Sequence, residues 1–248
     1  MSLFTTIPAG VSGVLDDDTA ARAILWLPVI GLLLGGTGAG VMLAVGSRNA
    51  TAPGRLLGAA LAVAVIAVLT GGLHLDGLAD TADGLGSRRP AATALEIMRR
   101  SDIGPMGVGA LVLGLLIQVT AVAAISRLSL AVAALVLAEV TGRVSVVVAT
   151  SSPAARPGGF GALVAGRTSA AERALTVGTL GCAVAAAGLT AGGPALAARG
   201  LAAALAGLAA GWLLQRAARR RLGGTTGDVF GAILQVSAMT TLIVAALS

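Results

Sequence analysis

The chain has 248 residues, of which 56% are apolar and only 11% are charged, and its mean hydropathy is strongly positive. This composition excludes an ordinary soluble protein, because the polar residues are too few to cover a water-facing surface. Aromatic residues make up only 2% of the chain, so no stacking platform accompanies the formal net charge of +6, and we expect no nucleic-acid partner.

Long hydrophobic runs recur along the whole chain and predict the fold class. Each is close to the length of about 20 residues that a helix needs to cross a bilayer, so we expect an all-α, polytopic integral membrane bundle with about seven transmembrane helices. Residues 1–248 are predicted to form one membrane-embedded domain. The Gly-Gly-Pro sequence at 192–194 divides two of the spans. The predicted spans cover residues 23–46, 56–75, 107–126, 128–150, 174–191, 195–214 and 229–248.

The distribution of arginine predicts the orientation, because all 17 basic residues are arginines. Most of them fall on the side of the spans that holds the N-terminus and the loops near 76–106, 151–173 and 215–228. Positive charge is retained on the cytoplasmic face. We therefore expect a multi-pass protein of the cell membrane, with the N-terminus and these loops in the cytoplasm and the C-terminus outside. The arginines on the opposite side are Arg48, Arg55, Arg127 and Arg199.

A short acidic segment follows the second predicted span. Residues 71–84 read GGLHLDGLADTADG and hold three of the 11 carboxylates in the chain. If the segment is helical, the spacing i, i+4, i+7 places Asp76, Asp80 and Asp83 on one face. Stacked like charges repel unless a cation neutralises them, and Mg²⁺ bound by carboxylates commonly shares its coordination sphere with substrate phosphates. The pattern predicts metal or phosphate chemistry; the alternative is a solvated acidic loop.

The only histidine of the chain, His74, precedes the first of these aspartates. An imidazole in this place can order a carboxylate, accept a proton or contact a phosphate. A histidine near the end of a helix is as often structural, and the sequence leaves these interpretations open.

Further polar residues on the same side suit an anionic substrate. Arg99 and Arg100 precede the third span, and arginine forks bind phosphate oxygens at two points. Asp228 follows a turn rich in Gly and Thr at the entrance of the last span, and such turns present backbone N–H groups to phosphate. Anchoring of the helix ends by positive charge is the alternative role for the arginines.

Glu139 and Arg143 are spaced i, i+4 inside the fourth predicted span and can pair on one face of that helix. Charges at membrane depth are costly, so this face is expected to line the bundle interior or a polar cavity. The spacing does not decide between a structural clamp and a contact with substrate.

The acidic segment with its preceding threonine, TGGLHLDGLADTADG at 70–84, resembles the signature of the cobalamin synthase family, whose members are adenosylcobinamide-GDP ribazoletransferases. Further segments resemble the family in the same order, so the likeness covers nearly the whole chain. These are RAILWLPVIGLLLG at 22–35, LEIMR with the glycines that follow at 95–107, Arg143, and LGGTTGDVFGA at 222–232.

The resemblance implies a reaction, a cofactor and substrates. Enzymes of this family join adenosylcobinamide-GDP to alpha-ribazole or its 5'-phosphate and release GMP, with Mg²⁺ required. It implies that Asp76, Asp80 and Asp83 hold the metal, and that His74 or one of these aspartates takes the hydroxyl proton. The substrate-binding residues would be Arg99, Arg100, Arg143 and Asp228.

The resemblance leaves open whether the chain forms a homo-oligomer or associates with other enzymes of cobalamin synthesis. The chain also departs from the family pattern, because Arg100 and Asp102 exchange the usual order of acid and base in the motif at 98–102. Two other functions are compatible with a membrane protein that has an acidic site. A CDP-alcohol phosphotransferase would need Ala-Arg after its first Asp-Gly, where this chain has Ala79-Asp80. A transporter would explain the many spans, but it would not explain carboxylates gathered at the cytoplasmic end of a helix.

Overall fold

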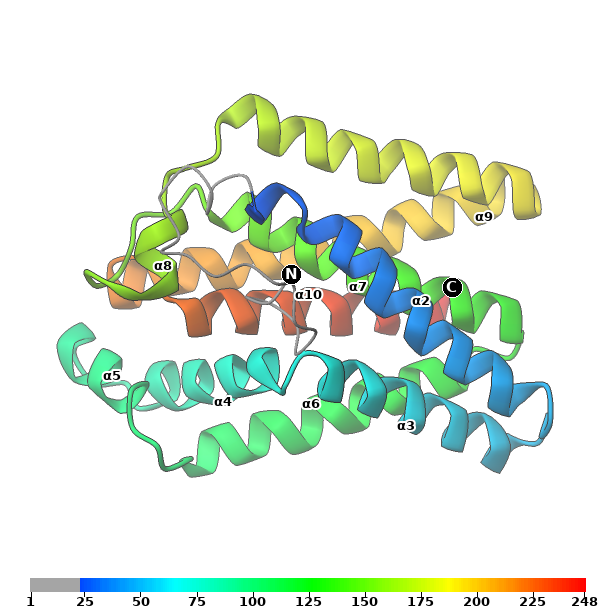
Figure 1. Cartoon of the computed structure of the whole chain (residues 1–248), viewed down its shortest axis with the longest axis horizontal. Coiled ribbons are helices and arrows are strands. Elements are labelled where there is room, and N and C mark those ends of the chain that lie inside the picture. Colours follow the sequence, from blue (N-terminus) through cyan, green and yellow to red (C-terminus); the bar gives the residue numbers. More distant parts are fainter. Residues whose placement is uncertain (1–22) are drawn as a thin grey trace, which may run out of the picture.

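The structure, a computed structural model, describes residues 23–248 (Figure 1). Within this range every regular element is a helix, and the one strand-like pairing is an isolated bridge between Ala154 and Thr225. The prediction of an all-α fold is therefore confirmed. The N-terminal segment, including Arg22, lies outside the described residues. The helices are α2 (Leu27–Gly46), α3 (Ala52–Leu69), α4 (Leu73–Gly86), α5 (Ala91–Ile97), α6 (Pro105–Ala124), α7 (Leu128–Ala149), α8 (Gly159–Val164), α9 (Ala170–Leu222) and α10 (Gly227–Leu247).

Six of the helices in residues 23–248 are long and apolar enough to cross a membrane, namely α2, α3, α6, α7, α9 and α10. Large apolar side chains lie on their outer faces: Val68 is 71% exposed, Leu113 61% and Leu213 58%. Such a surface is stable against lipid and not against water. These features confirm a polytopic membrane protein.

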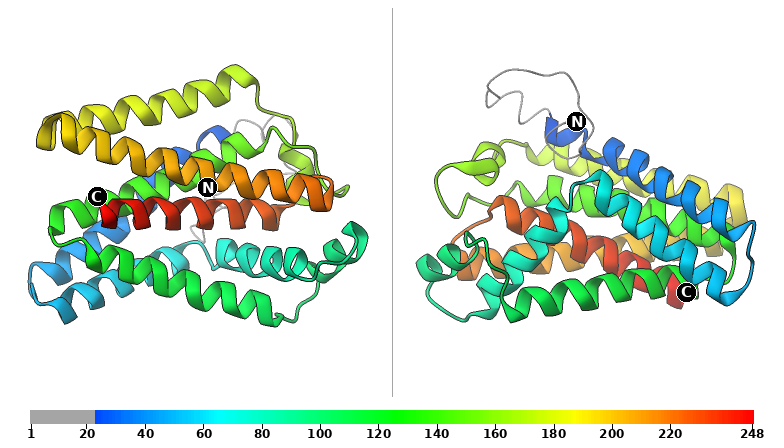
Figure 2. Two further views of the ribbon diagram at one scale, coloured as in Figure 1. Left: turned by 180° about the vertical axis from the view of Figure 1, so that it is seen from behind. Right: turned by 60° about the horizontal axis from the view of Figure 1, so that its bottom comes forward.

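The central helix of the bundle is α7. Within its most apolar stretch, 72% of the residues are buried, a larger share than in any other candidate span of the described residues. It packs against α2, α9 and α10, which surround it on three sides (Figures 1 and 2). Glu139 and Arg143 lie on this helix and are both buried, as predicted for charges at membrane depth.

The predicted span 56–75 is wrong at its end, because the chain breaks at Thr70–Gly72. Two successive glycines, Gly71 and Gly72, have φ values of 60° and 71°, which a right-handed helix does not allow. The helix before the break, α3, ends at Leu69, and a separate helix, α4, begins at Leu73. His74 therefore lies in the first turn of α4 instead of the last turn of α3.

The long helix α9 folds back on itself at Gly193, whose φ of 75° and ψ of −166° are not helical. Pro194 follows and cannot donate the backbone hydrogen bond that a continuous helix needs. The two arms run antiparallel from this bend (Figure 1), so the predicted break at 192–194 is confirmed. The number of seven crossings stays a prediction.

Candidate active site

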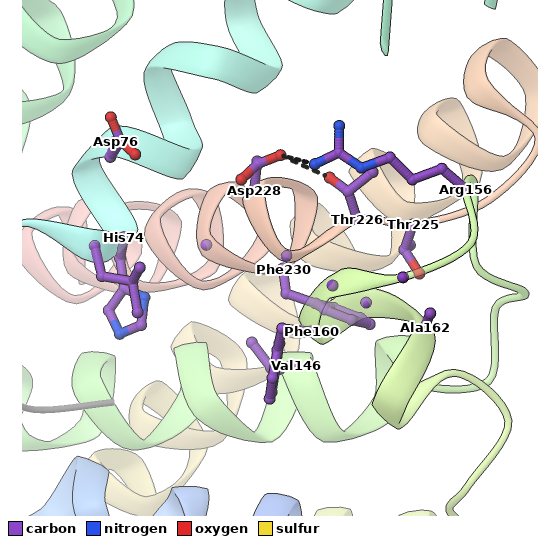
Figure 3. Close-up of a pocket in the computed structure, with 16 residues that line it drawn as sticks. His74, Asp76, Val146, Arg156, Phe160, Ala162, Thr225, Thr226, Asp228 and Phe230 are labelled. Atoms are coloured by element: carbon purple, nitrogen blue, oxygen red, sulfur yellow. Dashed lines mark hydrogen bonds and ion pairs between the residues drawn. The ribbon is translucent and has the colours of Figure 1, made fainter. Parts of the chain in front are cut away.

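A cavity of about 280 Å³ opens at the end of the bundle where α4, α7, α8 and α10 meet. Its walls come from distant parts of the sequence, with carboxylates on one side and aromatic rings on the other (Figure 3). Phe160 and Phe230 form an edge-to-face pair with ring centroids 6.3 Å apart. The polar lining residues are His74, Asp76, Arg156, Thr225, Thr226 and Asp228.

The two carboxylates of the cavity come from α4 and α10, which pack backbone to backbone. A methyl group at Gly77 would lie 2.6 Å from the carbonyl oxygen of Asp228, so only glycine allows the observed approach. Gly231 faces the same contact from α10. This crossing places Asp76 and Asp228 on neighbouring walls of one cavity (Figure 3).

Asp80 lies one turn beyond Asp76 on α4, is half-buried, and stands next to the cavity without lining it. Burial, followed by the charges of Asp76, Asp228 and Asp83, raises the pKa of the Asp80 carboxyl to about 6. Arg156 opposes this shift in pKa and does not cancel it. The acidic residues therefore repel one another across α4 and α10, which is the condition under which a bound cation stabilises a site.

Asp83, the third predicted metal ligand, is engaged with the start of α6. Its two carboxylate oxygens accept backbone hydrogen bonds from Gly104 at 2.7 Å and Gly107 at 2.8 Å. An anion in this position satisfies N–H groups that the first helical turn leaves without partners. The role of Asp83 in metal binding stays a prediction, but its observed contacts hold α4 and α6 together.

Arg156 is one of the arginines of the 151–173 loop that indicate orientation in the sequence, and the structure places it in the cavity. Its Nη2 lies 3.4 Å from Oδ2 of Asp228, which also accepts a hydrogen bond from the Thr226 hydroxyl at 3.1 Å (Figure 3). Backbone hydrogen bonds between Ala155 and Thr225, and between Thr225 and Pro153, hold the two loops together. The contact joins residues 72 positions apart, so no local sequence pattern could have revealed it.

His74 lies on the inner side of α4 and points toward α7, away from the Asp76 carboxylate (Figure 3). Burial, and secondarily the charge of Arg143, lowers the pKa of His74 to about 3. The imidazole is therefore neutral at physiological pH. It borders both the main cavity and a smaller internal one that Glu139 and Gln118 also line.

Arg143 and Glu139 form the predicted pair, with Nη1 of Arg143 2.6 Å from Oε2 of Glu139. The same nitrogen donates to the Glu139 carbonyl oxygen at 3.0 Å, and Nη2 of Arg143 is buried without a hydrogen-bond partner among residues 23–248. Arg143 is not among the residues that line the main cavity. Its predicted contact with substrate stays a prediction; in the structure it lies beneath the cavity, near His74.

Arg99 and Arg100 lie in the turn after α5, where both are exposed and neither lines the cavity. Their predicted contact with substrate phosphates also stays a prediction. Among residues 23–248, no group of three or more His, Cys, Asp or Glu side chains is arranged to hold a metal ion by itself.

The chain matches the family model described as cobalamin-5-phosphate synthase over residues 1–246. The chain belongs to this family. It is 43% identical to an adenosylcobinamide-GDP ribazoletransferase of Bradyrhizobium diazoefficiens, with 99% of this chain and 90% of that protein covered. It is 38% identical to the enzyme of the same name in Frankia casuarinae, with 100% and 92% covered. No solved structure matches the chain.

Membership of the cobalamin-5-phosphate synthase family makes the chain an enzyme, a transferase of cobalamin synthesis. The rival assignments to a CDP-alcohol phosphotransferase or a transporter are set aside on this ground. The acidic segment that resembles the family signature, residues 70–84, lines the cavity through Leu73, His74 and Asp76.

Proposed function

We propose that the chain joins adenosylcobinamide-GDP to alpha-ribazole or alpha-ribazole 5'-phosphate and releases GMP. The names of its relatives support these substrates. In this reaction a ribose hydroxyl oxygen attacks the phosphorus attached to cobinamide. The bond from that phosphorus to the bridging oxygen of the diphosphate breaks, and GMP leaves with the bridging oxygen. The observation that carries the proposal is the cavity that combines Asp76 and Asp228 with Arg156.

The cavity supplies what phosphoryl transfer requires, which is positioning and neutralisation of charge. The link from Arg156 to Asp228 is long at 3.4 Å, so the guanidinium keeps donors for phosphate oxygens. A volume of about 280 Å³ suits a diphosphate with part of a sugar. The corrinoid ring is larger and would lie outside the cavity, at the open end of the bundle.

The residues present fit Mg²⁺ shared with the substrate. Asp76 and Asp80 offer carboxylate oxygens, the ligand type that Mg²⁺ prefers, and the raised pKa of Asp80 reports negative charge in excess. Mg²⁺ commonly takes one or two carboxylates and completes its shell with water and substrate phosphates. When bound, the cation would neutralise the diphosphate. The prediction that Asp83 is a third ligand is retained as a secondary part of the proposal.

Asp228 is the carboxylate best placed to receive the hydroxyl proton. It lines the cavity, and contacts with Arg156 and Thr226 fix its orientation. His74 is a weak base because its pKa is lowered to about 3. We therefore assign to His74 a positioning role, as a buried side chain of α4 that borders the main cavity and the smaller internal one.

We further propose that the cavity opens to the cytoplasm. The arginines of the loops that form it support this orientation by the distribution of positive charge. The diphosphate of adenosylcobinamide-GDP is a water-soluble anionic group, which would reach the cavity from that side.

The proposal is tested by incubating purified protein with adenosylcobinamide-GDP, alpha-ribazole 5'-phosphate and Mg²⁺ and measuring GMP. We expect GMP and a joined corrinoid product in equal amounts, and loss of both with excess chelator. GMP release that continues without the ribazole would indicate hydrolysis and would refute the transferase assignment for these substrates.

A further inference from the structure

A third cavity, of about 610 Å³, lies between the two ends of α9 and the end of α7, away from the candidate active site. It shares no lining residue with the cavity described above. Both arms of α9 contribute to it. Its lining residues are Arg173 of the first arm, Trp212, Gln215, Arg216, Arg219 and Arg220 of the second, and Val148 and Ser151 at the end of α7.

The cavity exists because the arms of α9 diverge from the bend at Gly193. Near the bend they are in close contact: a methyl group at Gly188 would lie 2.3 Å from Cα of Ala197. Toward the other end the arms separate and form a V-shaped opening (Figures 1 and 2). The arginines stand at the wide end of this V, where α9 both begins and ends.

The charge in the cavity is of one sign. No Asp or Glu is among its lining residues, and in the described part of the chain none of its four arginines forms a salt bridge. Arg216 stacks on the ring of Trp212, 5.5 Å from its centroid, and Arg173 donates to the carbonyl oxygen of Thr168. Arginines gathered without counter-charge bind phosphate through several N–H donors.

The surface next to these arginines is apolar. Leu175 on the first arm is 71% exposed, and Leu205 on the second is 62% exposed. Both lie on a candidate membrane span. Trp212 is half-exposed at the boundary between the apolar and the charged part, the position where tryptophan gathers at membrane surfaces. A ligand that uses both parts carries an anionic head and long apolar chains.

We propose that the V of α9 is a binding site for an anionic phospholipid. The phosphate lies among Arg173, Arg216, Arg219 and Arg220, and the acyl chains follow the diverging arms. The site is independent of the reaction assigned above, because the two cavities share no residue. A bound lipid would fill the space that the hairpin leaves against α7.

Quenching of Trp212 fluorescence by brominated lipids tests the site. The chain has 2 tryptophans, so Trp26→Phe leaves Trp212 as the sole reporter. The protein is placed in nanodiscs with either brominated phosphatidylglycerol or brominated phosphatidylcholine at the same fraction. We expect phosphatidylglycerol to bind next to Trp212 with at least about five-fold preference, since one arginine near an anionic surface contributes roughly that factor. Equal quenching by the two lipids would overturn the proposal.

Two double variants that remove the same charge distinguish lipid binding in this cavity from a general attraction between the arginines and anionic lipids. Arg219→Gln with Arg220→Gln removes two lining arginines and keeps the contact of Arg216 with Trp212. Arg88→Gln with Arg221→Gln removes two exposed arginines that do not line the cavity. The preference should fall about five-fold or more in the first variant and persist in the second. Equal losses in both variants would contradict a specific site.

A further experiment distinguishes a lipid from a soluble anion as the occupant of the cavity. Inorganic phosphate at millimolar concentration is added to the nanodiscs that contain brominated phosphatidylglycerol. A lipid site predicts unchanged quenching, because the acyl chains hold the headgroup in place. Relief of the quenching by phosphate, to the level seen with phosphatidylcholine, would show that the arginines bind free anions and would overturn the lipid assignment.

Discussion

At the scale of single residues, the aspartates of α4 have the same chemistry and different surroundings. Asp80 is half-buried beside other carboxylates and its pKa is raised, whereas Asp83 accepts two backbone hydrogen bonds from the start of α6. Their spacing on one helical face was predictable from the sequence. The capping role of Asp83 was not, because it depends on how α6 packs against α4.

This difference predicts opposite effects of two similar substitutions. Asp80→Asn should abolish GMP release without lowering thermal stability, because it removes a proposed metal ligand and relieves repulsion. Asp83→Asn should lower the stability by roughly 1–2 kcal/mol, because an amide replaces the anion at the first turn of α6. Turnover and thermal unfolding of both variants in detergent provide the check. Normal turnover in Asp80→Asn would remove this residue from the site.

The raised pKa of Asp80 also predicts a dependence of stability on pH. The folded, metal-free protein holds this proton more tightly than the unfolded chain, so protonation stabilises the fold at acid pH, and the stabilisation is lost as the pH rises through about 6. Without metal, the thermal midpoint of unfolding should be lower at roughly pH 7 than at roughly pH 5, and this decrease should be smaller in Asp80→Asn. Mg²⁺ should restore the midpoint at the higher pH. If the thermal midpoint depends on pH in the same way in the wild type and in Asp80→Asn, the pKa of Asp80 is not raised.

At the scale of elements, the site depends on the close crossing of α4 and α10. The sequence predicted a span at 229–248, which agrees with α10, whereas a helix over the acidic segment was only a condition of the predicted spacing. The structure shows that helix as α4, which is separated from α3 by the break at Thr70–Gly72. The contact between α4 and α10 could not be predicted from the sequence, because no local pattern around Gly77 indicates which helix packs against it. Arg156 was missed for the same reason: its partner, Asp228, lies in another loop.

Gly77→Ala should therefore damage the site without touching a charged group. The added methyl group would lie 2.6 Å from the Asp228 carbonyl oxygen, so α4 must move away from α10. We expect turnover to fall by at least about ten-fold, since misplacement by an ångström costs more than that. Gly109→Ala on α6 is the matched control, because no neighbouring group among residues 23–248 lies within 4 Å of the added methyl group. Equal turnover in the two variants would show that the crossing is not critical.

At the scale of the whole molecule, hydropathy predicted the all-α membrane bundle, and the arginines predicted an orientation that the fold itself does not test. Labelling with a membrane-impermeant maleimide in intact cells tests it, starting from Cys182→Ala, which removes the only cysteine. Asn49→Cys should be labelled, and Ser101→Cys only after permeabilisation, because the two exposed residues lie on opposite sides. The reverse pattern would invert the topology and place the cavity outside the cytoplasm.

The central claim is that carboxylates of α4 hold a divalent cation together with the diphosphate of the substrate. Electron paramagnetic resonance of Mn²⁺, titrated into the protein with adenosylcobinamide-GDP and no ribazole, measures this binding directly. We expect bound Mn²⁺ in the wild type and a loss of at least about ten-fold in affinity in Asp76→Asn and Asp80→Asn. We expect no change in Asp102→Asn, because Asp102 neither lines the cavity nor is among the charges that raise the pKa of Asp80. Undiminished Mn²⁺ binding in both Asp76→Asn and Asp80→Asn would contradict the account.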